Sequence, residues 1–287
     1  MSETNALLET LRQEGVNSAL LAAVEEYRAA HALPEALQPR VPQSAFTYYG
    51  KDVWDQALAA LLCGENLLLA GGKATGKNVL AENLAAAFGR PAWDISFHVN
   101  MDAASLIGMD TFEGGQVKFR PGPVYRCAQC GGFGVLDEIN MAKNEALAVL
   151  HAVLDFRRAI DVPGYERIPR AEETRVIATM NYGYAGTREL NEALTSRFVV
   201  IQMPTITEEN LEKLLRAQFP ELNGKYVHQF AQLFLDLQKK CDSAEISTKA
   251  LDMGITNKAF DSYEQGLIRD AIAARIPAQL TAAKLFG

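Results

Sequence analysis

The stretch GGKATGKN, from Gly71 to Asn78, constrains the fold more than any other part of the sequence. It follows the apolar run LLLA and precedes a segment with helical spacing, so it predicts a strand, a tight loop and a helix. Glycines at this spacing let backbone N–H groups surround phosphate oxygens, while Lys77 reaches the terminal phosphates. The predicted phosphate-binding residues are Gly71, Gly72, Lys73, Ala74, Thr75, Gly76, Lys77 and Asn78. The competing interpretation is a glycine-rich structural turn.

Short apolar strands alternate with helical patterns around this loop. The expected strands are 66–70, 92–97, 134–136, 175–180 and 198–202. The expected helices between them are 78–88, 124–130, 143–155 and 189–195. This alternation predicts an α/β fold with a mostly parallel sheet that is covered on both faces. Two stretches, 108–121 and 156–169, interrupt the alternation and are expected to form inserted β-hairpins.

The sequence divides into three expected parts. Residues 1–45 combine a helical segment with a proline-containing linker, since Pro34, Pro39 and Pro42 interrupt the helical pattern. Residues 46–204 form the α/β core and begin with a helical pattern at 52–62. After Pro204 the pattern is helical throughout, which predicts a separate helical domain over residues 205–287.

Composition narrows the class of protein. The chain of 287 residues is 48% hydrophobic, which is enough to bury a large core. A net charge of −7 without a basic block argues against nonspecific binding to nucleic acid or to an anionic membrane. No apolar run approaches the length of a membrane span, and the start MSETNALLET lacks the features of a signal peptide. We therefore expect a cytoplasmic protein.

Two of the four cysteines, Cys127 and Cys130, lie close together in CAQC. A metal site usually needs a second pair of ligands, and the sequence offers none at a suitable spacing. Packing of both thiols within a helix is therefore the favoured interpretation over metal or redox chemistry.

An acidic pair follows the third expected strand, in GVLDEIN. We expect this strand to neighbour the strand before the phosphate loop, because Asp137 could then coordinate Mg²⁺ and Glu138 could polarise an attacking water. The alternative, a pair of acidic residues in the first turn of a helix, is common in proteins. The phosphate loop upstream favours the catalytic interpretation.

Two further motifs place polar residues beside strands. In VIATMNYG a strand ends in Asn181, whose amide could orient a water or could simply belong to a turn. In LNEALTSRF a helix delivers Arg197 just before the last strand. That arginine either pairs within its own chain or reaches a nucleotide bound by a neighbouring chain, and the sequence leaves both possibilities open.

These four motifs, in this order, resemble those of AAA+ ATPases. The closer resemblance is to the MoxR branch, including its CbbQ- and NorQ-like members, and it covers residues 46 to about 255. The motifs that carry it are DAASLIG, EGGQVKF, RPGPVYR, LDEIN, ATMNYGY and ELNEALTSRF. The resemblance implies a P-loop AAA+ core with a five-stranded parallel sheet, a C-terminal helical lid, and a ring, usually hexameric, with ATP bound between subunits.

The resemblance also assigns roles to single residues. It makes Lys77 the phosphate-binding lysine, Asp137 the Mg²⁺ residue, Glu138 the catalytic base, Asn181 the first sensor, Arg197 the arginine finger and Lys249 the residue at the second-sensor position, and it places Tyr49 beside the adenine. Exposed residues of the two hairpins, Phe112 and Tyr165, are expected to face the pore of the ring or a partner. Similar proteins act on a client protein together with a partner that carries a von Willebrand factor A domain.

Two residues depart from the family pattern. Asn78 stands where Ser or Thr would coordinate Mg²⁺, and its amide oxygen is a suitable hard ligand on a longer side chain. Lys249 stands where the family has Arg, which keeps the charge but loses the planar fork. We therefore expect a slow, Mg²⁺-dependent ATPase, and the first alternative is a nucleotide-binding scaffold with little turnover. A DNA-directed motor is disfavoured by the acidic composition.

Overall fold

The computed structural model describes residues 3–155, 157–162, 164–165, 167–182, 188–243 and 245. The chain divides into two compact units. The first comprises Met1–Gly72 and Gly76–Pro204, and the second begins at Thr205 and includes the tip of the loop, Lys73–Thr75. Each unit is described by itself.

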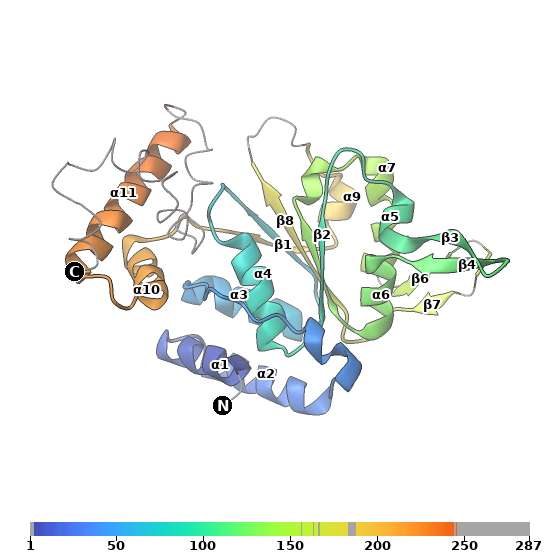
Figure 1. Ribbon diagram of the computed structural model, residues 1–287, viewed down its shortest axis with the longest axis horizontal. Coiled ribbons are helices and arrows are strands. Elements are labelled where there is room, and N and C mark those ends of the chain that lie inside the picture. Colours follow the sequence, from blue (N-terminus) through green and yellow to red (C-terminus); the bar gives the residue numbers. More distant parts are fainter. Residues whose placement is uncertain are drawn as a thin grey trace. The chain divides into compact units, whose positions relative to one another are not determined.

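A five-stranded sheet forms the centre of the first unit (Figure 1). Its strands are β1 (Leu67–Gly71), β2 (Ala92–Ser96), β5 (Phe133–Asp137), β8 (Arg175–Asn181) and β9 (Val199–Gln202). They lie in the order β2-β5-β8-β1-β9, and every pair is parallel. The expected strands and the expected parallel α/β fold are both confirmed.

The expected position of the acidic strand is wrong. Strand β5, which ends in Asp137, does not neighbour β1, because β8 lies between them. Sequence order cannot reveal this, since parallel strands are joined by long crossovers and a later strand can be inserted between two earlier ones. Strand β8 therefore pairs with β5 on one side and with β1 on the other. At its end Asn181 is paired in register with Gly71 of β1.

Helices cover both faces of the sheet (Figure 1). One face packs against α3 (Lys51–Leu62) and α4 (Lys77–Ala87). The other packs against the short helix α5 (Ala103–Ile107), which the sequence pattern did not predict, and against α6 (Pro123–Cys130) and α8 (Leu150–Leu154). Leucines of β1 alternate between the two cores, since Leu67 and Leu69 join the first and Leu68 the second.

Two of the expected helices differ from the prediction. The expected helix over 143–155 is interrupted at residues 148 and 149 and forms α7 (Asn144–Leu147) and α8. At the interruption the amide of His151 bonds to the carbonyl of Ala148, three residues back instead of four. The expected helix over 189–195 is shorter, and α9 spans Glu192–Thr195. It begins there because the side chain of Asn191 accepts a hydrogen bond from the Ala193 amide and caps the helix.

The N-terminal helices share the core of the first unit. These are α1 (Glu3–Gln13) and α2 (Ser18–Ala30), followed by the 3₁₀ helix η1 (Glu35–Arg40). Leu8, Leu11, Leu21 and Val24 are buried in the same cluster as residues of the sheet. The guanidinium of Arg40 lies 4.8 Å from the ring centroid of Trp93, a cation–π contact that ties the linker to the edge strand β2.

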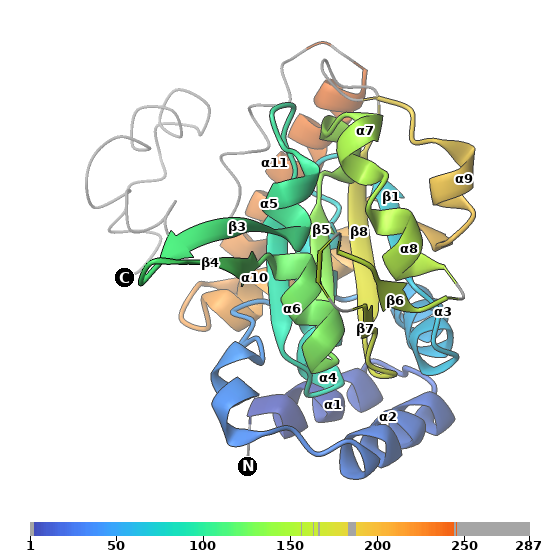
Figure 2. The ribbon, with the colours of Figure 1, turned by 90° about the vertical axis from the view of Figure 1, so that its right-hand side faces the viewer.

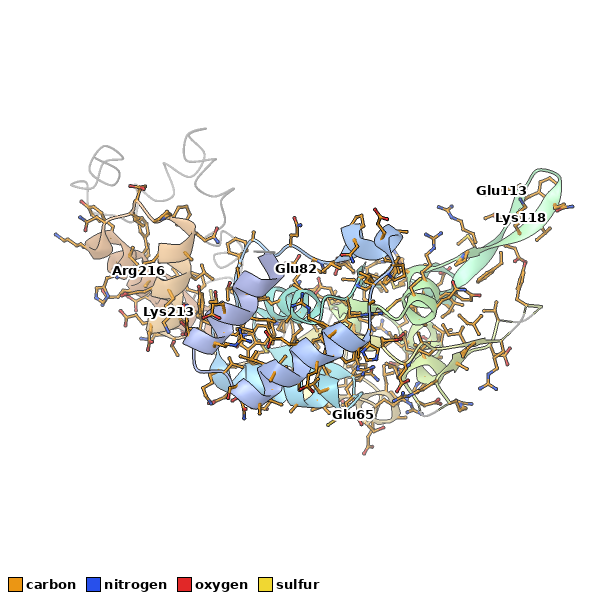
Figure 3. The ribbon with its side chains drawn as sticks, turned by 90° about the horizontal axis from the view of Figure 1, so that it is seen from below. Glu65, Glu82, Glu113, Lys118, Lys213 and Arg216 are labelled. Carbon is orange, nitrogen blue, oxygen red and sulfur yellow. The ribbon has the colours of Figure 1, made fainter. Side chains whose placement is uncertain are left out.

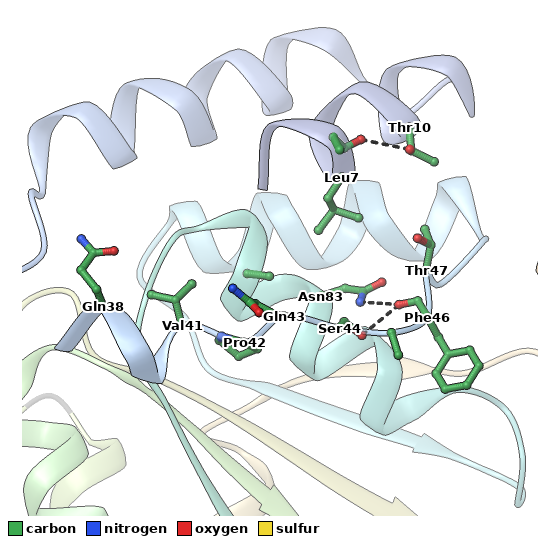
Figure 4. Close-up of a pocket in the computed structure, with 13 residues that line it drawn as sticks. Leu7, Thr10, Gln38, Val41, Pro42, Gln43, Ser44, Phe46, Thr47 and Asn83 are labelled. Atoms are coloured by element: carbon green, nitrogen blue, oxygen red, sulfur yellow. Dashed lines mark hydrogen bonds between the residues drawn. The ribbon is translucent and has the colours of Figure 1, made fainter. Parts of the chain in front are cut away.

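The linker runs over α4 as an extended strap, residues 41–48, and is held there by Asn83 (Figure 4). The Asn83 side chain donates to the carbonyl of Phe46 and accepts from the amide of Tyr48, both at 2.8 Å. Between the strap, α1 and α4 lies an open cleft of about 780 Å³. Its lining does not include the phosphate loop, so this cleft is a separate feature of the first unit.

Replacing Asn83 with Ala is expected to lower the free energy of unfolding by about 2 kcal/mol, because two backbone groups of the strap lose their partner. Thermal or urea unfolding measures this change. Gln38→Ala, a change of a polar residue on another wall of the same cleft, serves as the control and should leave the unfolding midpoint unchanged. Equal stability of Asn83→Ala and wild type would contradict the role given to the amide.

Both predicted hairpins are confirmed. The first consists of β3 (Gly108–Glu113) and β4 (Gln116–Pro121) and extends away from the sheet, with Glu113 and Lys118 near its tip (Figures 2 and 3). The second consists of β6 (Ala159–Ile160) and β7 (Ile168–Pro169). The hairpins are joined by Tyr165, whose hydroxyl donates to Asp110 at 2.6 Å and whose ring packs against Phe119.

From Thr205 onward, the described part of the second unit contains a pair of helices, α10 (Glu208–Gln218) and α11 (Gly224–Asp242). They share an apolar core that includes Leu211, Leu215 and Val227. On their surface His228 Nδ1 lies 2.9 Å from a carboxylate oxygen of Glu212, and this contact lowers the pKa of Glu212. Within the described residues, no helix has both the length and the apolar character needed to span a membrane.

Candidate nucleotide-binding site

The phosphate loop connects the end of β1 to the start of α4. Ala74 and Gly76 have left-handed backbones, with φ of 58° and 81°, and Gly76 is the N-cap of α4. Left-handed residues that alternate with right-handed ones turn successive N–H groups toward one side, which creates a binding site for anions. The first turn of α4 contains no acidic residue that would repel a phosphate.

Lys77 is buried at the base of this loop, with 7% of its surface exposed. Its Nζ donates to the carbonyls of Gly71, at 3.2 Å, and Gly72, at 2.5 Å. Burial lowers the pKa of Lys77 to about 8, and the negative charges of Asp137 and Glu138 oppose that shift. Lys77 and the acidic pair therefore interact electrostatically.

Asp137 ends β5 and is held by a residue that the sequence analysis missed. The hydroxyl of Thr179, on β8, donates to Asp137 Oδ1 at 2.7 Å. Thr179 is completely buried and lies two residues before Asn181, on the same face of the strand. Its polarity within the apolar strand VIATM was a detectable signal, because a buried hydroxyl needs a partner.

Glu138 and Asn181 contact each other. The Asn181 side-chain nitrogen donates to Glu138 Oε1 at 2.9 Å, which joins the ends of β5 and β8. The sequence predicts one site for both residues but does not predict this contact. Asn140, two residues after Glu138, was also missed: its side chain donates to the carbonyl of Asn181 at 2.9 Å, and it is 2% exposed.

An aromatic ring packs against the loop, and it belongs to Tyr48. A Cβ added at Gly76 would lie 2.9 Å from the Tyr48 ring, and one added at Gly50 would lie 2.7 Å from it. The carbonyl of Tyr48 accepts a hydrogen bond from the indole of Trp54, and burial raises the pKa of Tyr48 to about 12. Tyr49, the residue assigned to the adenine, is half-buried beside it.

Arg197 lies near a different group of side chains. Its guanidinium donates to the carbonyl of Ala193, one turn earlier in the chain. Burial lowers the pKa of His151, and the positive charge of Arg197 lowers it further by a smaller amount. The hydrogen bond from Arg157 lowers the pKa of Asp155, and the charge of Arg197 again makes a smaller contribution. The hydrogen bonds and ion pairs of the described residues do not connect Arg197 to Lys77 or Glu138.

The sequence also singled out Asn78, Lys249 and Cys127. Asn78 is exposed on the first turn of α4, where the Mg²⁺ ligand was expected. Lys249 lies outside the described residues. Cys127 is buried against Gly134, and burial raises the pKa of its thiol, which agrees with the packing interpretation.

Comparison with known proteins agrees with this geometry. Residues 66–198 match the family model described as AAA domain (dynein-related subfamily). Uncharacterized protein YojN of Bacillus subtilis (strain 168) is 32% identical, over 94% of this chain and 96% of its own length. The chain belongs to the AAA+ family. An AAA+ protein binds ATP, and Lys77 and the phosphate loop are the parts of this chain suited to that function.

Other relatives of this AAA+ protein match over shorter stretches. Uncharacterized protein SH1500 of Staphylococcus haemolyticus is 37% identical over 70% of this chain and 78% of its own length. A solved structure named "putative ATPase", from Cytophaga hutchinsonii, is 19% identical and has a TM-score of 0.48, and the match covers 73% of this chain and 58% of that one. We draw no argument from that structural likeness.

Proposed function

We propose that this AAA+ protein hydrolyses ATP in a Mg²⁺-dependent reaction. The observation that carries the proposal is the contact between Glu138 and Asn181, beside Asp137 and close to Lys77. A catalytic base needs a carboxylate within reach of the nucleophile and a neighbour that orients it, and Asn181 is such a neighbour for Glu138.

The candidate site contains oxygen ligands of the type that Mg²⁺ prefers. Asp137 offers a carboxylate whose Oδ1 is already oriented, and Asn78 offers an exposed amide oxygen, both of which are hard ligands. When bound, the ion would neutralise charge on the phosphates of ATP. Lys77 would bind the terminal phosphates, and loop N–H groups would hold the others.

The contact with Asn181 also determines which oxygen of Glu138 can act as the base. The Asn181 amide holds the Glu138 carboxylate through one oxygen, so the other oxygen stays available to accept a proton from water. The half-buried position of Glu138 limits competing solvent.

We propose further that the protein is of the MoxR type and works as a ring, hexameric in similar proteins. Arg197 donates to the carbonyl of Ala193, and no hydrogen bond or ion pair of the described residues joins it to Lys77 or Glu138, which supports a role at the nucleotide of a neighbouring subunit. The ring would remodel a client protein with a partner that carries a von Willebrand factor A domain. Phe112 and Val117, exposed by 76% and 63% and paired across the first hairpin, are candidate client contacts.

A second function is favoured by one observation. Asn78 replaces the hydroxyl residue at the Mg²⁺ position, so the chain could bind nucleotide and assemble with little turnover. Both the scaffold and the slow ATPase would bind nucleotide, but only the ATPase would release phosphate.

Phosphate release from ATP and Mg²⁺ at rising protein concentration tests the proposal. We expect turnover per subunit to increase with concentration, because a neighbour's Arg197 completes each site. Asn78→Thr should raise turnover by about 3- to 10-fold, since it restores the shorter oxygen ligand. Bound ATP without phosphate release in the wild type would contradict hydrolysis and favour the scaffold, and phosphate release gained by Asn78→Thr would identify Asn78 as the cause.

A further inference from the structure

We propose that Thr179 is a positioning residue that sets the geometry of both acidic groups of the site, and this inference rests on the proposed ATP hydrolysis. Thr179 is not expected to touch the nucleotide. It would act through Asp137 and Glu138, which it joins by a single hydroxyl group.

The hydrogen bonds of Thr179 have only one consistent direction. The backbone N–H of Glu138 can only donate, and it lies 3.0 Å from Thr179 Oγ1. The hydroxyl proton is therefore free to be donated to Asp137 Oδ1, at 2.7 Å. A donor aimed at Oδ1 orients the carboxylate and leaves Oδ2 as the oxygen available to a cation.

Glu138 needs this support because its backbone is left-handed, with φ of 55° and ψ of 45°. Among the described residues only Ala74 and Arg158 share this feature without being glycine. Left-handed geometry is unfavourable for a side chain of this size and persists where the surroundings enforce it. Thr179 bonds the amide of Glu138, and the Met141 amide donates to its carbonyl at 2.8 Å, so both peptide groups are held.

The left-handed turn has a consequence for the side chain. It ends β5 immediately after Asp137 and allows the Glu138 carboxylate to meet Asn181 at the end of the next strand. Without the bond from Thr179, Glu138 could relax toward an ordinary backbone and leave Asn181. One buried hydroxyl thus orients the proposed Mg²⁺ residue and the proposed base together.

The packing around Thr179 does not by itself require a hydroxyl. It follows Val176, Ile177 and Ala178, which are apolar and buried. Val has the same shape as Thr and would fill the same space, so Thr179→Val removes the two hydrogen bonds with little change in packing. Thr179→Ser keeps the hydroxyl and loses a methyl group, which makes it the matched control.

Three measurements on the full-length protein test the inference. The first is binding of a fluorescent ATP analogue in EDTA and at increasing Mg²⁺. The second is the dependence of phosphate release on ATP concentration. The third is amide hydrogen exchange of the peptide that contains Glu138, without nucleotide.

For Thr179→Val we expect unchanged binding in EDTA and a requirement for about tenfold more Mg²⁺. Turnover should fall about 30-fold at saturation, with less than about a 3-fold change in KM. The Glu138 amide should exchange at least about tenfold faster. Thr179→Ser should resemble wild type in all three measurements.

The inference is wrong if a folded Thr179→Val variant keeps the wild-type Mg²⁺ dependence and the wild-type exchange rate at Glu138. If Thr179→Val does not fold, Thr179→Ala replaces it in the same measurements with the same criteria. A wild type that binds nucleotide without turnover would contradict the proposed hydrolysis. Hydrogen exchange would still decide whether Thr179 positions Glu138.

Discussion

Replacing Glu138 with Gln is expected to lower ATP turnover by at least about 100-fold while the protein still binds ATP. The change keeps the shape of the side chain and removes the group that accepts a proton from water. Binding should persist, or strengthen, because Glu138 lies close enough to affect the pKa of Lys77, so its negative charge also repels the triphosphate. Phosphate release and equilibrium binding of a fluorescent ATP analogue measure the two effects separately.

Glu145→Gln is the matched control for this prediction. Glu145 is exposed on α7, so the same change of charge occurs away from the site, and turnover should stay at the wild-type level. Turnover of Glu138→Gln within about 3-fold of wild type would exclude Glu138 as the catalytic base.

Replacing Lys77 with Ala should weaken ATP binding by about 100-fold and abolish measurable turnover. Lys77 is the buried cation of the loop, and it donates to the carbonyls of Gly71 and Gly72 from a position next to the acidic pair. Loss of this ammonium group removes a charge-assisted contact with the terminal phosphates. Binding of the fluorescent analogue, measured with and without Mg²⁺, quantifies the change.

Lys118→Ala provides a control with the same change in net charge. Lys118 is exposed on the first hairpin, so its removal should leave ATP affinity within about 3-fold of wild type. A similar loss of affinity in both variants would mean that overall charge determines binding. Unchanged affinity in a folded Lys77→Ala variant would contradict the assignment of the phosphate loop.

The sequence determined most of the elements, and it named side chains that the fold brings together, such as Lys77, Glu138 and Asn181. A loop such as GGKATGKN needs a strand before it and a helix after it, and short apolar runs separated by helices imply a parallel sheet. These inferences depend on local spacing, which is why β1, α4 and both hairpins were predicted correctly. The same locality explains the failure at 143–155, where helical composition did not reveal the interruption between α7 and α8.

The tertiary structure decided which residues meet. It placed β8 between β1 and β5, so that Asn181 could contact Glu138 and Thr179 could join both acidic residues. It also assigned the ring beside the loop to Tyr48 and directed Arg197 toward Ala193. The contacts of Glu138 with Asn181 and of Thr179 with both acidic residues link residues about 40 positions apart through the pairing of strands. The order of strands in a sheet depends on crossovers that no local pattern encodes.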